Sequence, residues 1–178
     1  MTDKKQRQFD AALAYATAKH SGQKRIGGLD YITHPVAVSE IVRRKGGGID
    51  EQITALFHDL LEDTDATEDE ILALGNERIL HAVKLLTKKH GYVMADYVAA
   101  IKNDKIAFAV KGADRLHNLN SSFCASEDFR WRYILETVDW YLDFDPEIPA
   151  AVKAVAESLD TPLSELPFIY TPVETWKI

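Results

Sequence analysis

Apolar residues recur at helical spacing along most of this chain, and glycine and proline interrupt the pattern. Near the N-terminus, Phe9, Ala12, Leu13 and Ala16 follow the i, i+3, i+4 rule of an amphipathic helix. No segment requires the strict alternation of a β-strand. The sequence therefore predicts an all-α fold, and 178 residues suit a single domain with a sizeable core.

The positions of glycine and proline set the predicted boundaries. Residues 21–33 are polar and contain three glycines, so they are predicted to form a loop, and Pro35 suits the first turn of the next helix. Three prolines after Thr161 predict that residues 161–178 are an extended tail beyond a domain of residues 1–160. Helices are predicted at residues 4–20, 35–45, 50–63, 67–73, 75–88, 94–101, 104–122, 128–144 and 147–158.

Charge and composition exclude some classes of function. A net charge of −7 argues against a nucleic-acid-binding protein, although a local cationic pocket can still bind a small anion. No apolar stretch reaches the ~18–20 residues of a membrane span, and the N-terminus lacks an apolar signal core, so we expect a cytoplasmic protein that does not bind membranes. The apolar tail leaves two alternatives open, namely packing on its own domain or a homo-oligomer. The segment of residues 88–90, KKH, is predicted to be a solvated helix end.

An acidic cluster interrupts the apolar face of the predicted helix at residues 50–63. Asp59, Glu62 and Asp63 stand at i, i+3 and i+4, directly after His58. Three carboxylates on one face repel one another unless a cation neutralises them. Taken alone, the cluster is more typical of the solvated acidic end of a helix than of a metal site.

Two other segments favour a metal site. His34 stands at a predicted helix start, and Asp114 lies within an apolar helix, where an unpaired carboxylate is costly. Together with His58 and Asp59 they form a mixed nitrogen and oxygen set that suits Mn²⁺, Fe²⁺, Zn²⁺ or Mg²⁺, and carboxylates with open water positions favour Mn²⁺. Asn118 and Ser121 follow Asp114 at i+4 and i+7, so one helix face could hold the metal and line a ligand site.

Four motifs resemble the hydrolase domain of the RelA/SpoT enzymes and their small single-domain relatives, including those of metazoans, within the HD superfamily. The motifs are HSGQKR at residues 20–25, YITHP at 31–35, HDLLEDT at 58–64 and KGADRLHNL at 111–119. The resemblance extends from about residue 11 to residue 142. It implies an all-helical HD fold, a Mn²⁺ ion, and hydrolysis of the 3′-pyrophosphate of the alarmone guanosine tetra- or pentaphosphate, with release of pyrophosphate.

The resemblance also implies roles for individual residues. His34, His58, Asp59 and Asp114 match the metal ligands, and Glu62 and Asp63 match the acidic pair that positions the attacking water. Arg25 and Asn118 match residues that contact the nucleotide. The charges of Lys24 and Lys111 could also neutralise the leaving pyrophosphate, and Ser121 shares the helix face of Asn118, so all five are expected substrate contacts.

The chain departs from the family pattern near the expected substrate site. Ile26 stands where a second basic residue is common, Gly112 where leucine is common, and Asn120 where arginine is common. We expect Gly112 to leave more room near the pocket or to let another segment approach. The departures predict a weaker preference for guanine over adenine. Two alternatives stay open, namely an HD-type phosphatase acting on another nucleotide and a nucleotide-binding regulator without turnover.

Overall fold

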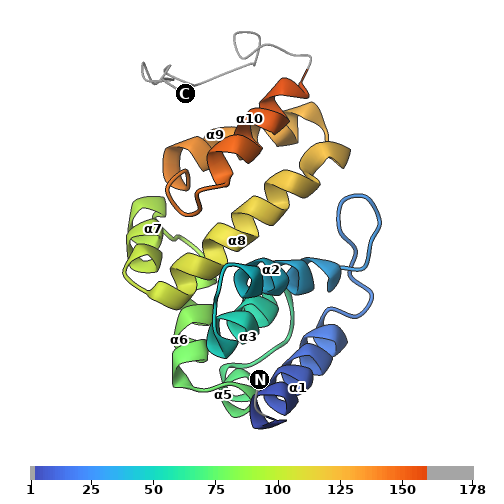
Figure 1. Cartoon of the computed structure of the whole chain (residues 1–178), viewed down its shortest axis with the longest axis vertical. Helices are drawn as coiled ribbons and strands as arrows, with labels where there is room; N and C mark the ends of the chain where they lie inside the picture. The colour runs from blue at the N-terminus through green and yellow to red at the C-terminus, as the bar shows by residue number, and fades with distance from the viewer. Residues whose placement is uncertain (1–2, 160–178) are drawn as a thin grey trace.

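The computed structural model describes residues 3–159, and helices account for most of them (Figure 1). The predicted all-α fold is confirmed, since those residues contain no strand and their one β-bridge joins Lys24 to Asp30 within a loop. The predicted tail at 161–178 lies outside the described residues. The α-helices are α1 (Asp3–Lys19), α2 (Thr33–Arg44), α3 (Ile49–Phe57), α4 (Leu60–Asp63), α5 (Glu68–Leu74), α6 (Glu77–Leu86), α7 (Met94–Lys102), α8 (Lys105–Ser121), α9 (Glu127–Trp140) and α10 (Ile148–Glu157), with a 3₁₀ turn η1 (Ser122–Cys124) after α8.

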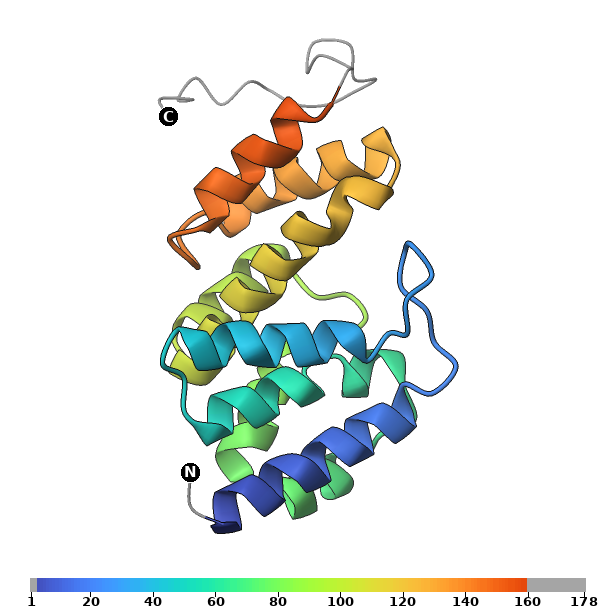
Figure 2. The same ribbon diagram turned by 45° about the vertical axis from the view of Figure 1, so that its right-hand side comes forward.

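Helix α8 lies at the centre of the fold. Figures 1 and 2 show it running between α1–α6 on one side and the pair α9 and α10 on the other. It packs against α2, α3, α6, α7 and α10. Its buried residues Ile106, Val110 and Ala113 recur at i, i+4 and i+7, so helical spacing places one apolar stripe in the larger core. A second buried cluster joins α1 to α3 and α6 through Ala16, Leu56 and Ile79.

Helix ends coincide with residues that satisfy free backbone groups. Thr67 and Glu70 form the capping box expected from their spacing. Asn76, Asp104 and Ser126 accept backbone N–H groups at the starts of α6, α8 and α9. The Asp104 cap fixes where α8 begins, and therefore how its polar residues are placed along its length.

The predicted helix at 50–63 is wrong in one respect, because α3 ends at Phe57 and α4 begins at Leu60. The side chain of His58 donates from Nδ1 to the carbonyl of Ala55, 2.8 Å away, and satisfies a carbonyl at the end of α3. Asp59 has φ −99° and ψ −5°, away from regular helical values. The interruption places His58 and Asp59 at a turn between two helices.

The loop at 20–32 projects beside the C-terminal end of α8 (Figure 2). Gly27 and Gly28 have φ of +96° and +89°, a region that other residues rarely adopt. Arg25 bonds Leu29 through the backbone and closes the tip of the loop. The described part of the chain contains no helix long and apolar enough to cross a bilayer. The cytoplasmic location stays a prediction.

Candidate metal centre

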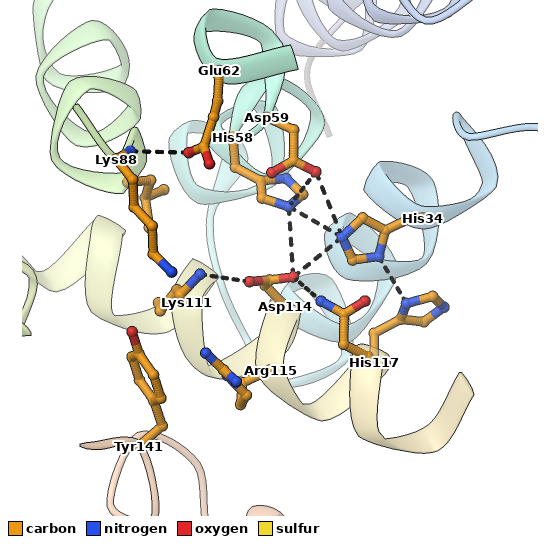
Figure 3. Close-up of polar contacts among 12 residues, drawn as sticks. His34, His58, Asp59, Glu62, Lys88, Lys111, Asp114, Arg115, His117 and Tyr141 are labelled. Carbon is orange, nitrogen blue, oxygen red and sulfur yellow. Dashed lines mark hydrogen bonds and ion pairs between the residues drawn. The ribbon is translucent and has the colours of Figure 1, made fainter. Parts of the chain in front are cut away.

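Four residues from three parts of the chain converge at the middle of the fold (Figure 3). His34 lies in the first turn of α2, His58 and Asp59 lie at the turn between α3 and α4, and Asp114 lies within α8. His34, His58 and Asp59 each offer a ligand atom within 4.8 Å of the others. Asp114 Oδ1 lies 3.1 Å from His34 Nε2 and 3.7 Å from His58 Nε2. The sequence-predicted ligand set is therefore brought together in space.

The charges of this cluster favour a cation. Burial and the neighbouring imidazole lower the pKa of His34. Burial also lowers the pKa of His58, but the carboxylates of Asp59 and Asp114 outweigh it and raise the pKa to about 9. The Nε2 atoms of His34 and His58 lie 3.2 Å apart, beside the carboxylate oxygens of Asp59 and Asp114. Without a metal, a proton on His58 is shared among these nitrogen and oxygen lone pairs. A divalent cation satisfies the same lone pairs, so the donor set fits a metal.

Hydrogen bonds from surrounding residues orient the two imidazoles. The Nδ1 of His58 donates to the Ala55 carbonyl, so its Nε2 is left to face the cluster. His34 Nδ1 lies 2.8 Å from His117 Nδ1, and its Nε2 also faces the cluster. Such outer partners fix the tautomer and ring orientation of metal-ligating histidines.

The two carboxylates are also held by neighbours. Tyr31 donates to Asp59 Oδ2 at 2.7 Å, and burial raises the pKa of its phenol, which keeps the hydroxyl a donor. Lys111 Nζ lies 2.8 Å from Asp114 Oδ2, and Asn118 donates to Asp114 Oδ1 at 2.6 Å. Burial raises the pKa of Asp114, but Lys111 and the two imidazoles outweigh it and hold the pKa well below its usual range.

The predicted acidic pair divides between two environments. Asp63 Oδ2 lies 3.3 Å from the Tyr31 hydroxyl that also holds Asp59, and burial with the Asp59 charge raises the pKa of Asp63. Glu62 makes a separate contact, since its Oε2 accepts the backbone N–H of Lys88 at 2.9 Å. Asp63 is thus the member of the pair tied to the metal cluster.

A cavity of about 280 Å³ lies between the loop at 20–32 and the end of α8. Arg25 crosses it, donating to Asn118 at 2.8 Å and Ser121 at 3.2 Å. Phe129 and Tyr133 line another part with nearly parallel rings, 5.8 Å between centroids. Further lining residues are Lys24, Ile26, Tyr31, Ser122 and Ala125. Four of the five predicted substrate contacts therefore line one cavity.

Lys111 is placed differently from the other predicted substrate contacts. Its side chain is 12% exposed and its ammonium pairs with Asp114. Burial lowers the pKa of Lys111, but Asp114 outweighs it and raises the pKa well above its usual value. In this structure Lys111 supports a predicted metal ligand.

Gly112 does not enlarge the cavity. A Cβ at this position would lie 2.5 Å from the carbonyl oxygen of Phe144, so glycine lets the segment before α10 approach α8. Of the two consequences expected from the sequence, the close approach of another segment is confirmed. Ile26, by contrast, lines the cavity and is 57% exposed.

The sequence pattern indicates no role for Tyr31 and predicts that Lys88 belongs to a solvated helix end. Tyr31 lies 28 residues from Asp59, so only the tertiary fold reveals their hydrogen bond. The prediction for Lys88 is wrong, because its side chain is 26% exposed and its ammonium lies near two tyrosine rings. His117 hydrogen-bonds within the fold, at 2.8 Å from the Nδ1 of His34.

The fold and cluster define an all-helical domain with a histidine and aspartate set of the kind that binds a divalent metal. A family model described as an HD domain matches residues 12–144, and the chain belongs to this family. A solved structure described as a metazoan orthologue of SpoT that hydrolyses ppGpp has a TM-score of 0.70 and 21% identity, covering 84% of this chain and 94% of that one. This likeness confirms the fold.

Curated relatives are longer proteins. GTP pyrophosphokinase rsh of Brucella ovis is 34% identical over 182 residues, which cover 95% of this chain and 23% of the relative. Guanosine-3′,5′-bis(diphosphate) 3′-pyrophosphohydrolase of Aquifex aeolicus is 30% identical over 178 residues, covering 96% of this chain and 25% of the relative. The chain spans about a quarter of the length of these relatives.

Proposed function

We propose that this chain is a metal-dependent phosphohydrolase that removes the 3′-pyrophosphate of guanosine 3′,5′-bis(diphosphate) or a related purine nucleotide. One observation carries the proposal. Asn118 donates to Asp114 in the metal cluster and accepts from Arg25 across the cavity, so one side chain links the two sites. The name of the Aquifex relative and membership of the HD domain family support the same activity.

In this proposal His34, His58, Asp59 and Asp114 hold the metal, and Mn²⁺ is the ion we expect. When bound, the ion would supply Lewis acidity and lower the pKa of water. Lys111 and Tyr31 keep the two carboxylates aimed inward, through contacts of 2.8 Å and 2.7 Å.

Asp63 is the proposed proton acceptor. Its raised pKa moves it toward neutral pH, where a general base is most effective. Its bond to Tyr31 keeps it beside Asp59. Glu62 is tied to the chain at Lys88, and we propose that it orients the water that Asp63 deprotonates.

The cavity beside Arg25 is the proposed nucleoside site. The rings of Phe129 and Tyr133 offer aromatic faces to a purine. Arg25 and Lys24 supply positive charge at the cavity. Ile26 supplies no positive charge at a position where the family commonly has a second basic residue. We therefore propose weak discrimination between guanine and adenine.

Product analysis of a nucleotide panel incubated with Mn²⁺ tests the proposal. The panel contains the guanosine and adenosine 3′-pyrophosphates and nucleoside monophosphates. Release of pyrophosphate from the 3′-pyrophosphates is expected, with a guanine preference below ~10³-fold, or about 4 kcal/mol. Release of orthophosphate from the monophosphates alone would favour the phosphatase alternative. Tight nucleotide binding without any product would favour the regulator.

A further inference from the structure

Three cationic side chains lie on the side of Asp114 away from His34 and His117 (Figure 3). These are Lys88, Lys111 and Arg115, here called the basic cluster. Arg115 donates to Glu136 Oε1 at 2.7 Å, and the ammonium of Lys88 lies 4.0 Å from the same oxygen.

The basic cluster holds more positive than negative charge. Arg115 is buried between Tyr133 and Tyr141, at 4.2 and 4.1 Å from the ring centroids. Glu136 offsets one of the three cations, Glu62 bonds the backbone N–H of Lys88 and not its ammonium, and Asp114 offsets another cation only while its charge is not shared with a metal. On a chain of net charge −7, such a local surplus next to a metal-binding cluster favours a small anion.

Lys88 is the member of the cluster that an anion can reach. Its side chain is 26% exposed, compared with 12% for Lys111 and 3% for Arg115. Its ammonium lies 5.3 Å and 5.7 Å from the ring centroids of Tyr92 and Tyr97, which limit its movement. Its backbone N–H bonds Glu62, so the position of Lys88 is fixed relative to the acidic pair.

We propose that Lys88, supported by Lys111 and Arg115, forms a subsite for the pyrophosphate group that the reaction releases. This inference rests on the proposed function. The nucleoside cavity is lined by Arg25 and Asn118 at the other end of the metal cluster. With the nucleoside held there, the phosphates beyond the cleaved bond extend toward Lys88. The ligand chemistry is a diphosphate, and we assign it to the 3′ position and not to the 5′-diphosphate of the nucleotide.

Equilibrium dialysis of the Mn²⁺-loaded protein with radiolabelled pyrophosphate, at a fixed free Mn²⁺ concentration, tests the subsite. Lys88→Met should weaken pyrophosphate binding by at least ~10-fold, the lower end expected for a hydrogen bond to a charged group. Lys88→Arg should restore most of the binding. Lys89→Met is the matched control, because Lys89 is the exposed neighbour of the same charge, and it should bind pyrophosphate as the unmodified protein does.

A parallel titration with GDP separates the two possible diphosphates. GDP carries the 5′-diphosphate alone, so its binding should change less than ~2-fold in Lys88→Met, within the small effect of an exposed charge. Loss of GDP binding with unchanged pyrophosphate binding would overturn the assignment in favour of the 5′-diphosphate. Equal pyrophosphate binding by Lys88→Met and Lys89→Met would overturn the subsite itself.

Because dialysis needs no turnover, the subsite and the proposed function can fail separately. Pyrophosphate binding that depends on Lys88, in a protein that cleaves no 3′-pyrophosphate, would support the subsite and contradict the function. Cleavage of a 3′-pyrophosphate, with pyrophosphate binding that does not depend on Lys88, would support the function and contradict the subsite.

Discussion

The hydroxyl of Tyr31 is expected to set the affinity of the metal site. It donates to Asp59 Oδ2 at 2.7 Å, the same oxygen that lies 3.2 Å from His58 Nε2. A hydrogen bond to a charged group contributes about 1.5–3 kcal/mol. Because the Asp59 side chain is 21% exposed, water can replace part of the lost bond, which favours the lower end of that range. Tyr31→Phe should therefore weaken Mn²⁺ binding by roughly 10-fold, at 1.4 kcal/mol for each factor of ten.

Calorimetric titration of the metal-free protein with Mn²⁺ measures this effect. Tyr97→Phe is the matched control, since it removes a hydroxyl that donates to the Leu86 carbonyl at 2.8 Å, away from the predicted ligands. The control should lose about 1 kcal/mol of folding stability and keep its Mn²⁺ affinity. Equal Mn²⁺ affinity in Tyr31→Phe and the unmodified protein would refute the reasoning that Tyr31 orients a metal ligand.

Three further changes test the proton acceptor, the nucleotide cavity and the burial of His117. Asp63→Asn should retain the metal and lower kcat by at least ~10²-fold, because it removes the proposed proton acceptor, and an unchanged kcat would move that role to Glu62. Ile26→Lys should lower KM by roughly 10-fold and change kcat less, because an added charge binds ground and transition states alike; steady-state kinetics with the guanosine 3′-pyrophosphate measure both. Burial and then His34 lower the pKa of His117 to about 4 from 6.5, so the metal-free fold should lose stability as pH falls from 6.5 to 4, by roughly 1–2 kcal/mol after allowing for partial exposure. Denaturant unfolding of His117→Gln across this range should show a smaller loss, and equal losses would contradict the pKa argument.

The helices could be predicted from the sequence because apolar spacing follows the geometry of one element at a time. The interruption after Phe57 could not, since Leu56 and Leu60 continue the apolar pattern across it. The interruption coincides with a hydrogen bond from the side chain of His58 to the Ala55 carbonyl, which the apolar pattern does not encode.

The metal cluster and its neighbours differed in how far they could be predicted. The proposed ligands were identified because a histidine and a carboxylate in apolar surroundings need a partner. The pairing of Lys111 with Asp114 was within reach as well, since they stand at i and i+3 on one helix. Contacts across the fold, such as that between Arg25 and Asn118, join residues 93 positions apart and needed the tertiary structure.

The proposed metal site is tested by the Mn²⁺ content of purified His58→Ala and Asp59→Ala, measured by atomic spectroscopy beside the unmodified protein. His58 and Asp59 are the two proposed ligands at the turn between α3 and α4, and each change removes one of the four ligands. Stoichiometric Mn²⁺ is expected in the unmodified protein and almost none in either variant, with loss of pyrophosphate release. Full Mn²⁺ occupancy in both variants would contradict it.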